Sequence, residues 1–305
     1  MSIKLLINGF FRSGTTIVWK IFRESNPDII SFYEPCHEEI LDRLELFQRK
    51  PYIDKLHNIS VWDEYFKPPG LIPLIRRHHP NPGKGNIFPD NERDVVDYTK
   101  VYDDLDIDVI LQTNRWGLFL EEIHKELGAP IMHITRNPFD VYRSMQNVYF
   151  GQGSIVKNIT KNAFIDYFSK RAFSISKMYE HISRKFGLRL RQRKTKLDDE
   201  FNSEAFDMFF IVWSVTNYYA IKAMEDGKGL AITHEVMLQR PDGAKGVIEA
   251  EFGIAFNHGG ILKQPTRAVF LSDEENKLLL KTAQELNIYD EFFYVAKNAG
   301  GALAG

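Results

Sequence analysis

The residues best suited to bind an anion lie near the N-terminus, where positions 9–16 read Gly-Phe-Phe-Arg-Ser-Gly-Thr-Thr. An apolar run precedes this stretch at 3–7, and a helix-like pattern of apolar residues follows it. A strand, a glycine turn and a helix start together bind phosphate, because backbone N–H groups and the positive end of the helix dipole point at the anion. Gly14 lets the backbone approach closely, and Arg12 adds a planar cation. This stretch therefore predicts a phosphate-binding turn.

The spacing matches the G-x-x-x-x-G-K-[ST] loop of proteins that bind nucleoside triphosphates, with one difference. Thr15 stands where that loop has a lysine, which serves the β- and γ-phosphates of a triphosphate. The difference argues against ordinary ATP or GTP chemistry. Two alternatives stay open: a P-loop kinase or related phosphotransferase, and a strand-to-helix turn that binds no ligand.

A second candidate anion site follows the apolar run 131–134. Arg136 comes just after this run, at the edge where α/β sheets bind ligands, and a proline two residues later suits the start of a helix. Ser144 lies about two helical turns further on, along the same face. A guanidinium and a hydroxyl can converge on one anion. The alternative is a structural ion pair between Arg136 and a carboxylate such as Asp140.

Together these two motifs resemble the signatures of PAPS-dependent sulfotransferases, where PAPS is 3′-phosphoadenosine 5′-phosphosulfate. The order of the motifs and the interval between them also fit that family. The resemblance implies that the first motif holds the 5′-phosphosulfate end of PAPS and the second holds the 3′-phosphate. The implied PAPS-binding residues are Arg12, Ser13, Gly14, Thr15 and Thr16 in the first motif and Arg136 and Ser144 in the second.

Glu34 is the candidate catalytic base, because a Tyr-Glu-Pro segment after the phosphate turn resembles carbohydrate sulfotransferases. The resemblance implies that Glu34 takes the proton of an acceptor hydroxyl and that Arg12 stabilises charge on the leaving group. It also implies PAPS as donor, PAP as product, no metal, and a small-molecule, carbohydrate or glycoconjugate acceptor. Three alternatives remain: His37 as the base, Glu34 in a local ion pair, and a relative that binds nucleotide without catalysis.

Other candidates come from later loops. Asn114, Arg115 and Trp116 follow a third strand and could bind PAPS or the acceptor, although Trp116 could equally belong to the core. Lys263 and Arg267 lie in a loop from which family members often reach the nucleotide.

The elements that must position these residues alternate between strands and helices. Helix-like segments at 16–23 and 117–127 lie between short β-rich runs, a pattern typical of an α/β fold. The expected strands are 3–7, 29–33, 109–111, 131–134 and 230–232. We expect a P-loop-type, nucleotide-kinase-like parallel sheet flanked by helices, with helical insertions, in one domain spanning 1–305.

Two stretches interrupt this pattern, and a short tail follows it. Residues 67–92 are rich in proline and glycine and predict a loop or lid without regular structure. Residues 162–224 look mostly helical and contain a basic run at 189–196, which we expect to be a solvated charged turn. Residues 298–305 predict a flexible tail.

Composition excludes several classes of protein. Lysine and arginine number 39 against 41 acidic residues, which argues against a general nucleic-acid-binding surface. Cys36 is the only cysteine, which rules out an intramolecular disulfide and a cysteine-based zinc site. The longest uncharged stretch, 208–221, is too short to span a bilayer and predicts a buried helix. We expect a cytoplasmic protein.

Overall fold

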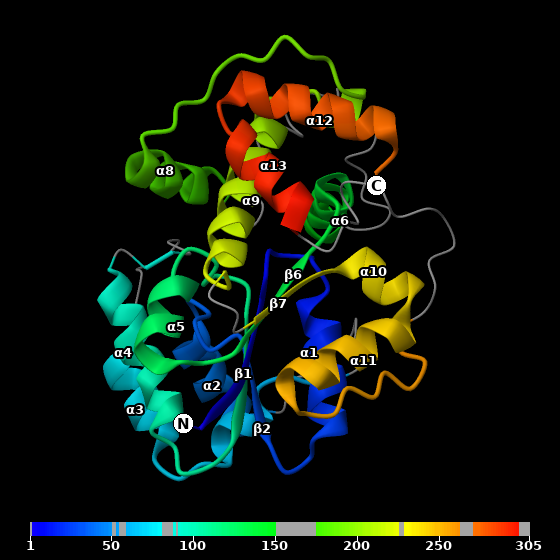
Figure 1. The fold of residues 1–305 in the computed structure, drawn as a ribbon. Helices are drawn as coiled ribbons and strands as arrows, with labels where there is room; N and C mark the ends of the chain where they lie inside the picture. The colour runs from blue at the N-terminus through cyan, green and yellow to red at the C-terminus, as the bar shows by residue number, and fades with distance from the viewer. Residues whose placement is uncertain are drawn as a thin grey trace.

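The computed structural model describes residues 2–50, 53–54, 59–80, 88–89, 91–150, 175–225, 229–262 and 271–298. A five-stranded sheet lies at its centre (Figure 1). In spatial order the strands are β2 (Ile30–Tyr33), β5 (Val109–Thr113), β1 (Ile3–Gly9), β6 (Ile131–Thr135) and β7 (Gly229–Thr233), and all neighbours pair in parallel. A small antiparallel pair, β3 (Ile53–Asp54) and β4 (Ile59–Ser60), lies apart from this sheet.

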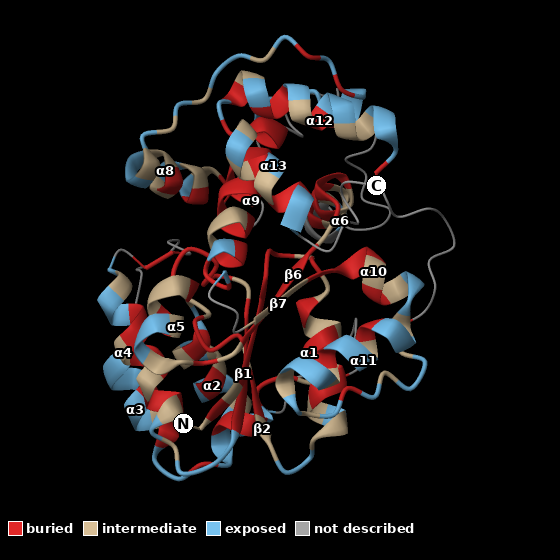
Figure 2. Cartoon of the chain, in the orientation of Figure 1, coloured by how far each residue is buried: buried red, intermediate tan, exposed pale blue. Residues whose placement is uncertain are grey.

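The three central strands explain why the sequence shows unbroken apolar runs. Every residue of β5 and β6 is buried, and only one residue of β1 is partly exposed. Helices cover both faces of the sheet, so alternation between polar and apolar residues is not needed. Figure 2 shows buried residues along the strands and on the inward sides of the flanking helices.

Helices surround the sheet on both faces and beyond one end. Figure 1 shows α3, α4 and α5 on one side, α1, α10 and α11 on the other, and α6, α8, α9, α12 and α13 beyond the carboxyl ends of the strands. The bounds are α1 (Thr15–Ser25), α2 (Ile40–Arg49), η1 (Asp63–Phe66), α3 (Leu71–His78), α4 (Glu92–Asp103), α5 (Leu120–Leu127), α6 (Pro138–Phe150), α8 (Ile175–Phe186), η4 (Asp199–Phe201), α9 (Glu204–Lys222), α10 (His234–Gln239), α11 (Pro241–Phe252), α12 (Asp273–Leu286) and α13 (Tyr289–Asn298).

The predicted α/β fold with a P-loop-type parallel sheet is confirmed, and all five predicted strands are present. The expectation that 67–92 lacks regular structure is wrong for α3. Gly70 begins this helix with a φ of 77°, and Pro73 lies in the first turn, where a missing backbone N–H leaves no hydrogen bond unmade. Leu71 and Ile75 then bury one face of the helix. The single-domain organisation stays a prediction.

The expectation for 162–224 is confirmed for α8 and α9 but not for the connection between them, which has no regular secondary structure apart from η4. Four basic residues of the run in that connection are exposed as expected, namely Arg189, Arg191, Lys194 and Lys196, but the run forms no turn and Arg193 is an exception. The side chain of Arg193 is 4% exposed, and its Nε donates to Asp207 of α9 at 2.5 Å. The backbone N–H groups of Lys194 and Thr195 donate to Glu285 of α12. The run therefore fastens two helices together.

The predicted buried helix at 208–221 is confirmed as the middle of α9, which buries most of its side chains within the protein. Within the described ranges, no helix combines the length and apolar character needed to cross a membrane. The predicted tail lies outside the described residues apart from Asn298, the last residue of α13.

Candidate active site

All five strands of the sheet end at one cavity of about 570 Å³, a size suited to a small-molecule ligand. The residues that follow the strands and line the cavity are Phe11 and Arg12 after β1, Glu34 after β2, Asn114 and Arg115 after β5, Arg136 after β6, and His234 after β7. Parallel strands bring their carboxyl ends to one edge, which is why residues so distant in sequence meet there.

The turn after β1 is held in an unusual backbone conformation. Arg12 has a φ of 65° and Gly14 has a φ of 92°, and Gly14 is also the residue before the first turn of α1. A Cβ atom on Gly14 would lie 2.5 Å from Cδ2 of His234, so only glycine fits. The hydroxyl of Thr16 lies 3.1 Å from the hydroxyl of Tyr33. The turn thus has the close-approach geometry expected of an anion cradle.

The two predicted anion-binding motifs meet. Nε of Arg12 donates to the hydroxyl of Ser144 at 3.0 Å, and Nη1 of Arg136 donates to the carbonyl oxygen of Arg12 at 3.0 Å. Within the described ranges no carboxylate lies at ion-pair distance from Arg136, so the alternative pairing with Asp140 is not seen. The guanidinium of Arg136 is therefore held beside the turn by a backbone carbonyl and not by an ion pair with any of the described residues.

Glu34 lies at the opposite side of the cavity in a network of polar side chains. It has a φ of 44° and is 8% exposed. Its carboxylate accepts from Nη1 of Arg115 at 2.6 Å and from Nδ2 of Asn114 at 2.9 Å. Arg115, itself 5% exposed, also donates through Nε to Glu38 at 3.0 Å, and its guanidinium lies over the ring of Phe11. Arg115 therefore connects Glu34 to the turn after β1.

His37, the alternative base, is next to this network. Its Nε2 lies 4.0 Å from a carboxylate oxygen of Glu34. Burial, with the positive charge of Arg115 as the second cause, lowers the pKa of His37 to about 2. The imidazole is therefore neutral near pH 7, but a group with such a low pKa accepts a proton poorly.

His234 is a cavity residue that the sequence reasoning missed. It is 8% exposed, faces Gly14, and its Nδ1 is buried without a hydrogen-bond partner in the described structure. Burial and then the charge of Arg136 lower the pKa of His234 to about 3. The next residue, Glu235, is fully buried, and burial raises its pKa to about 7. The position of His234 in the sequence could have identified it as a site candidate, because it directly follows strand β7, as Glu34 directly follows β2.

The remaining candidate site residues differ in where they lie: some line the cavity, one is in the core, and two are outside the described residues. Asn114 and Arg115 line the cavity as predicted, whereas Trp116 is fully buried in the core. Lys263 and Arg267 lie outside the described residues. The described part of the chain holds no cluster of three or more side chains suited to bind a metal ion.

Comparisons with known proteins show the family to which the chain belongs. The chain matches the sulfotransferase domain family over residues 2–196, more than half of its length and including both anion-binding motifs and Glu34. An uncharacterized protein of Archaeoglobus fulgidus is 27% identical over 266 residues, which are 79% of this chain and 80% of that protein.

Two solved structures are also similar. A sulfotransferase domain from the curacin biosynthetic pathway has a TM-score of 0.41 and 11% identity, covering 87% of this chain and 77% of that one. A sulfotransferase domain from the Synechococcus PCC 7002 olefin synthase has a TM-score of 0.40 and 12% identity, covering 87% and 78%. With its family match spanning the turn after β1, the strand end at Glu34 and the start of α6, this chain belongs to the sulfotransferase domain family.

Proposed function

We propose that this protein transfers the sulfuryl group of PAPS to a hydroxyl of a carbohydrate or glycoconjugate acceptor. The observation that carries the proposal is the shared cavity, onto which the turn after β1, Arg136 and Glu34 all open from the ends of parallel strands. One side of the cavity presents cations and backbone donors suited to phosphates, and the other presents a carboxylate suited to a hydroxyl.

The residues present fit the donor. The ring of His234 packs against Gly14, where a Cβ atom would clash with it, and the N–H of Ser13 already donates to the carbonyl oxygen of Phe10. The backbone N–H groups of residues 14–16, at the start of α1, would therefore bind the 5′-phosphate. Arg136 and Ser144 would hold the 3′-phosphate, and Arg12 would neutralise charge on the bridging oxygen as it leaves. Because arginines can supply this positive charge, the proposed reaction calls for no divalent metal.

Glu34 would act as the base. As the bond between the acceptor oxygen and sulfur forms and the bond between sulfur and the 5′-phosphate oxygen breaks, the hydroxyl proton passes to Glu34. Each carboxylate oxygen has two lone pairs, so Glu34 can accept this proton while keeping its bonds to Arg115 and Asn114. These bonds fix the orientation of the carboxylate, which favours attack along one line.

Ligand-dependent thermal unfolding tests the proposal. We expect PAP to raise the melting temperature and ATP with magnesium to leave it unchanged. The opposite preference would favour a phosphotransferase. Mass spectrometry of a carbohydrate panel incubated with PAPS should then show the sulfate mass increment on one acceptor. Tight PAP binding without transfer to any acceptor in a broad panel would point instead to a nucleotide-binding relative that lacks activity.

A further inference from the structure

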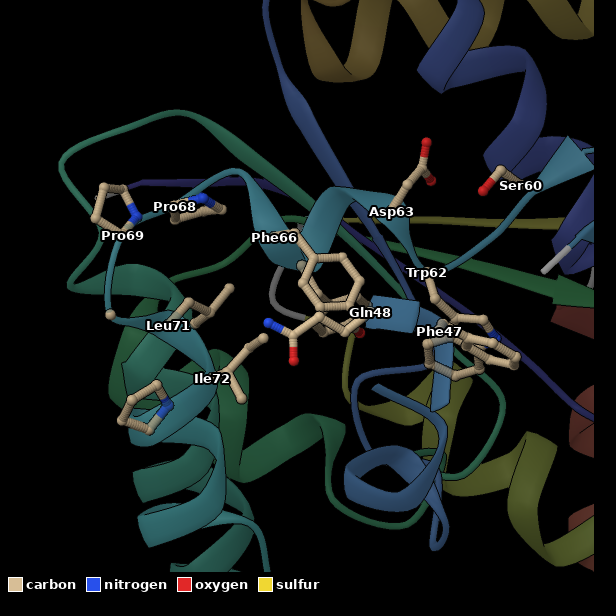
Figure 3. A pocket seen from close by; sticks show the side chains of 13 residues that line it. Phe47, Gln48, Ser60, Trp62, Asp63, Phe66, Pro68, Pro69, Leu71 and Ile72 are labelled. Carbon is tan, nitrogen blue, oxygen red and sulfur yellow. The ribbon is translucent and has the colours of Figure 1, made fainter. Parts of the chain in front are cut away.

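A second cavity, of about 700 Å³, lies in the segment between β2 and α4 (Figure 3). Its lining comes from the end of α2, from η1 and from the start of α3, and it consists mainly of aromatic, proline and aliphatic side chains. Phe47, Trp62, Phe66, Pro68 and Ile72 define what we call the apolar cavity. Such a lining suits an apolar ligand group of moderate size.

The segment that forms the apolar cavity also exposes several apolar side chains. Among the described residues, eight large hydrophobic side chains are exposed, and four of them belong to α2, β3, η1 and α3. These four are Leu46, Ile53, Phe66 and Leu74. Of these four, Phe66 lines the apolar cavity, so an apolar ligand in the cavity would cover a side chain that is otherwise exposed to water.

The cavity of about 570 Å³ at the strand ends is called the active-site cavity. The apolar cavity lies next to it, on the other side of Trp62. The ring of Trp62 stands edge-on to the rings of Tyr33 and His37, which line the active-site cavity, with centroids 5.6 and 5.8 Å away. The guanidinium of Arg43 lies over the same indole at 5.9 Å. Trp62 therefore lines the apolar cavity and contacts residues that line the active-site cavity, so it lies between the two.

A row of residues four apart, from Glu39 just before α2 to Phe47 near its end, connects the active-site cavity with the apolar cavity. Glu39 and Arg43 line the active-site cavity, and Phe47 lines the apolar cavity. Residues four apart on a helix lie on one face, about 6 Å from one step to the next. A ligand lying along this face would thus pass from a polar, carboxylate-containing site to an aromatic one within the length of a small molecule.

We propose that the apolar cavity binds the apolar aglycone of the acceptor, so that the acceptor is a glycoconjugate with an alkyl or aryl group. This inference rests on the proposed function and makes its substrate class more specific. The sugar hydroxyl lies at Glu34, and the apolar group lies beyond Trp62 against Phe47 and Ile72. A free sugar lacks the second contact and binds more weakly.

Calorimetry in the presence of saturating PAP tests this inference, with methyl β-glucoside and octyl β-glucoside as probes, the latter kept below its micelle concentration. We expect the octyl compound to bind at least about tenfold more tightly, because each buried methylene contributes favourably to binding. Ile72→Trp fills the apolar cavity and should remove this advantage. Leu74→Trp on the same helix is the matched control, because Leu74 is exposed and does not line the cavity.

Phe47→Ala and Leu46→Ala form a second matched pair on α2, in which only the first should weaken octyl glucoside binding. Equal affinities of the two glucosides, no saturable binding of the octyl compound, or equal losses in each pair would overturn the inference. PAP binding is followed in the same samples. If the unmodified protein does not bind PAP, the proposed function itself is contradicted. This outcome differs from a failure of the aglycone inference, in which PAP binds but the octyl group gives no advantage.

Discussion

The active-site cavity has two sides, a proposed phosphate side at the turn after β1 and Arg136, and a proposed acceptor side at Glu34. An arginine has a different kind of partner on each side. On the phosphate side, Arg136 donates to a backbone carbonyl and, within the described structure, has no carboxylate at ion-pair distance. On the acceptor side, Arg115 is bonded to both Glu34 and Glu38. Each arginine follows a strand end, so their places in the sequence look alike. The difference comes from residues that follow other strands. Arg136 meets a backbone carbonyl and can still bind a ligand anion, whereas Arg115 meets two carboxylates and orients Glu34.

Both sides also hold a non-glycine residue in the left-handed backbone region. Arg12 has a φ of 65° and Glu34 a φ of 44°. Such conformations cost on the order of 1–3 kcal/mol each and persist only where the surroundings impose them. Their presence at two proposed site residues is consistent with a cavity shaped for function at some expense of stability.

Glu34→Gln is the substitution expected to have the largest effect, and it separates the two sides by function. Loss of a general base lowers kcat by about 10²- to 10⁴-fold, whereas the phosphate side is untouched. Transfer assays should show this loss, and calorimetry should show PAP affinity changed by less than about threefold. Activity that survives in Glu34→Gln but is lost in His37→Gln would show that the base is His37.

Arg115→Met tests whether the acceptor side depends on its internal ion pairs for stability. The substitution leaves two carboxylates without their buried partner, which destabilises proteins by about 3–5 kcal/mol. Urea unfolding measures the change. The control is Arg93→Met, because Arg93 forms ion pairs with Asp97 and Glu126 on the surface and should lose less than about 1 kcal/mol. Similar losses in both variants would contradict a structural role for the buried pairs.

The sequence was sufficient to predict the strands and the glycine turn between β1 and α1 because both depend on local patterns. Buried parallel strands require unbroken apolar runs, and the turn requires Gly14 at its position. The α3 helix was missed because prolines were interpreted as helix breakers, although Pro73 lies in the first turn, where proline is tolerated.

Other features of the site could not be predicted, because they depend on contacts between distant segments. Nothing near Glu34 in the sequence indicates that Arg115 would bind it, and nothing near Gly14 indicates that His234 would pack against it. The apolar cavity likewise depends on how α2, η1 and α3 pack together.

Glu235→Gln contrasts a second buried carboxyl group with Glu34. Glu235 accepts the N–H of Asn137 at 2.8 Å but forms no ion pair within the described structure, and burial raises its pKa from 4.5 to about 7. The folded state therefore binds a proton that the unfolded state has released between these pH values, so this group lowers stability as pH rises. Over this pH range the free energy of unfolding falls by up to about 3 kcal/mol because of this group.

Glutamine keeps an acceptor for Asn137 and cannot ionise, so Glu235→Gln should gain stability relative to the unmodified protein as pH increases from 4.5 to 7.5. Urea unfolding at several pH values measures this difference. His234, whose pKa is lowered to about 3, acts in the opposite direction but is present in both proteins and cancels. A difference that does not change with pH would mean that Glu235 does not titrate in this range.

Arg136→Ala has the smallest expected effect and tests the phosphate side itself. A hydrogen bond between a guanidinium and a phosphate contributes about 1.5–3 kcal/mol, so PAP affinity should fall by roughly 10- to 100-fold. Calorimetry with adenosine 5′-monophosphate is the control, because this nucleotide lacks the 3′-phosphate and should lose less than about threefold. Arg136 also donates to the carbonyl of Arg12, so a disturbed turn would weaken both nucleotides equally. That equal loss would place the 3′-phosphate elsewhere and leave Arg136 as a support for the turn after β1.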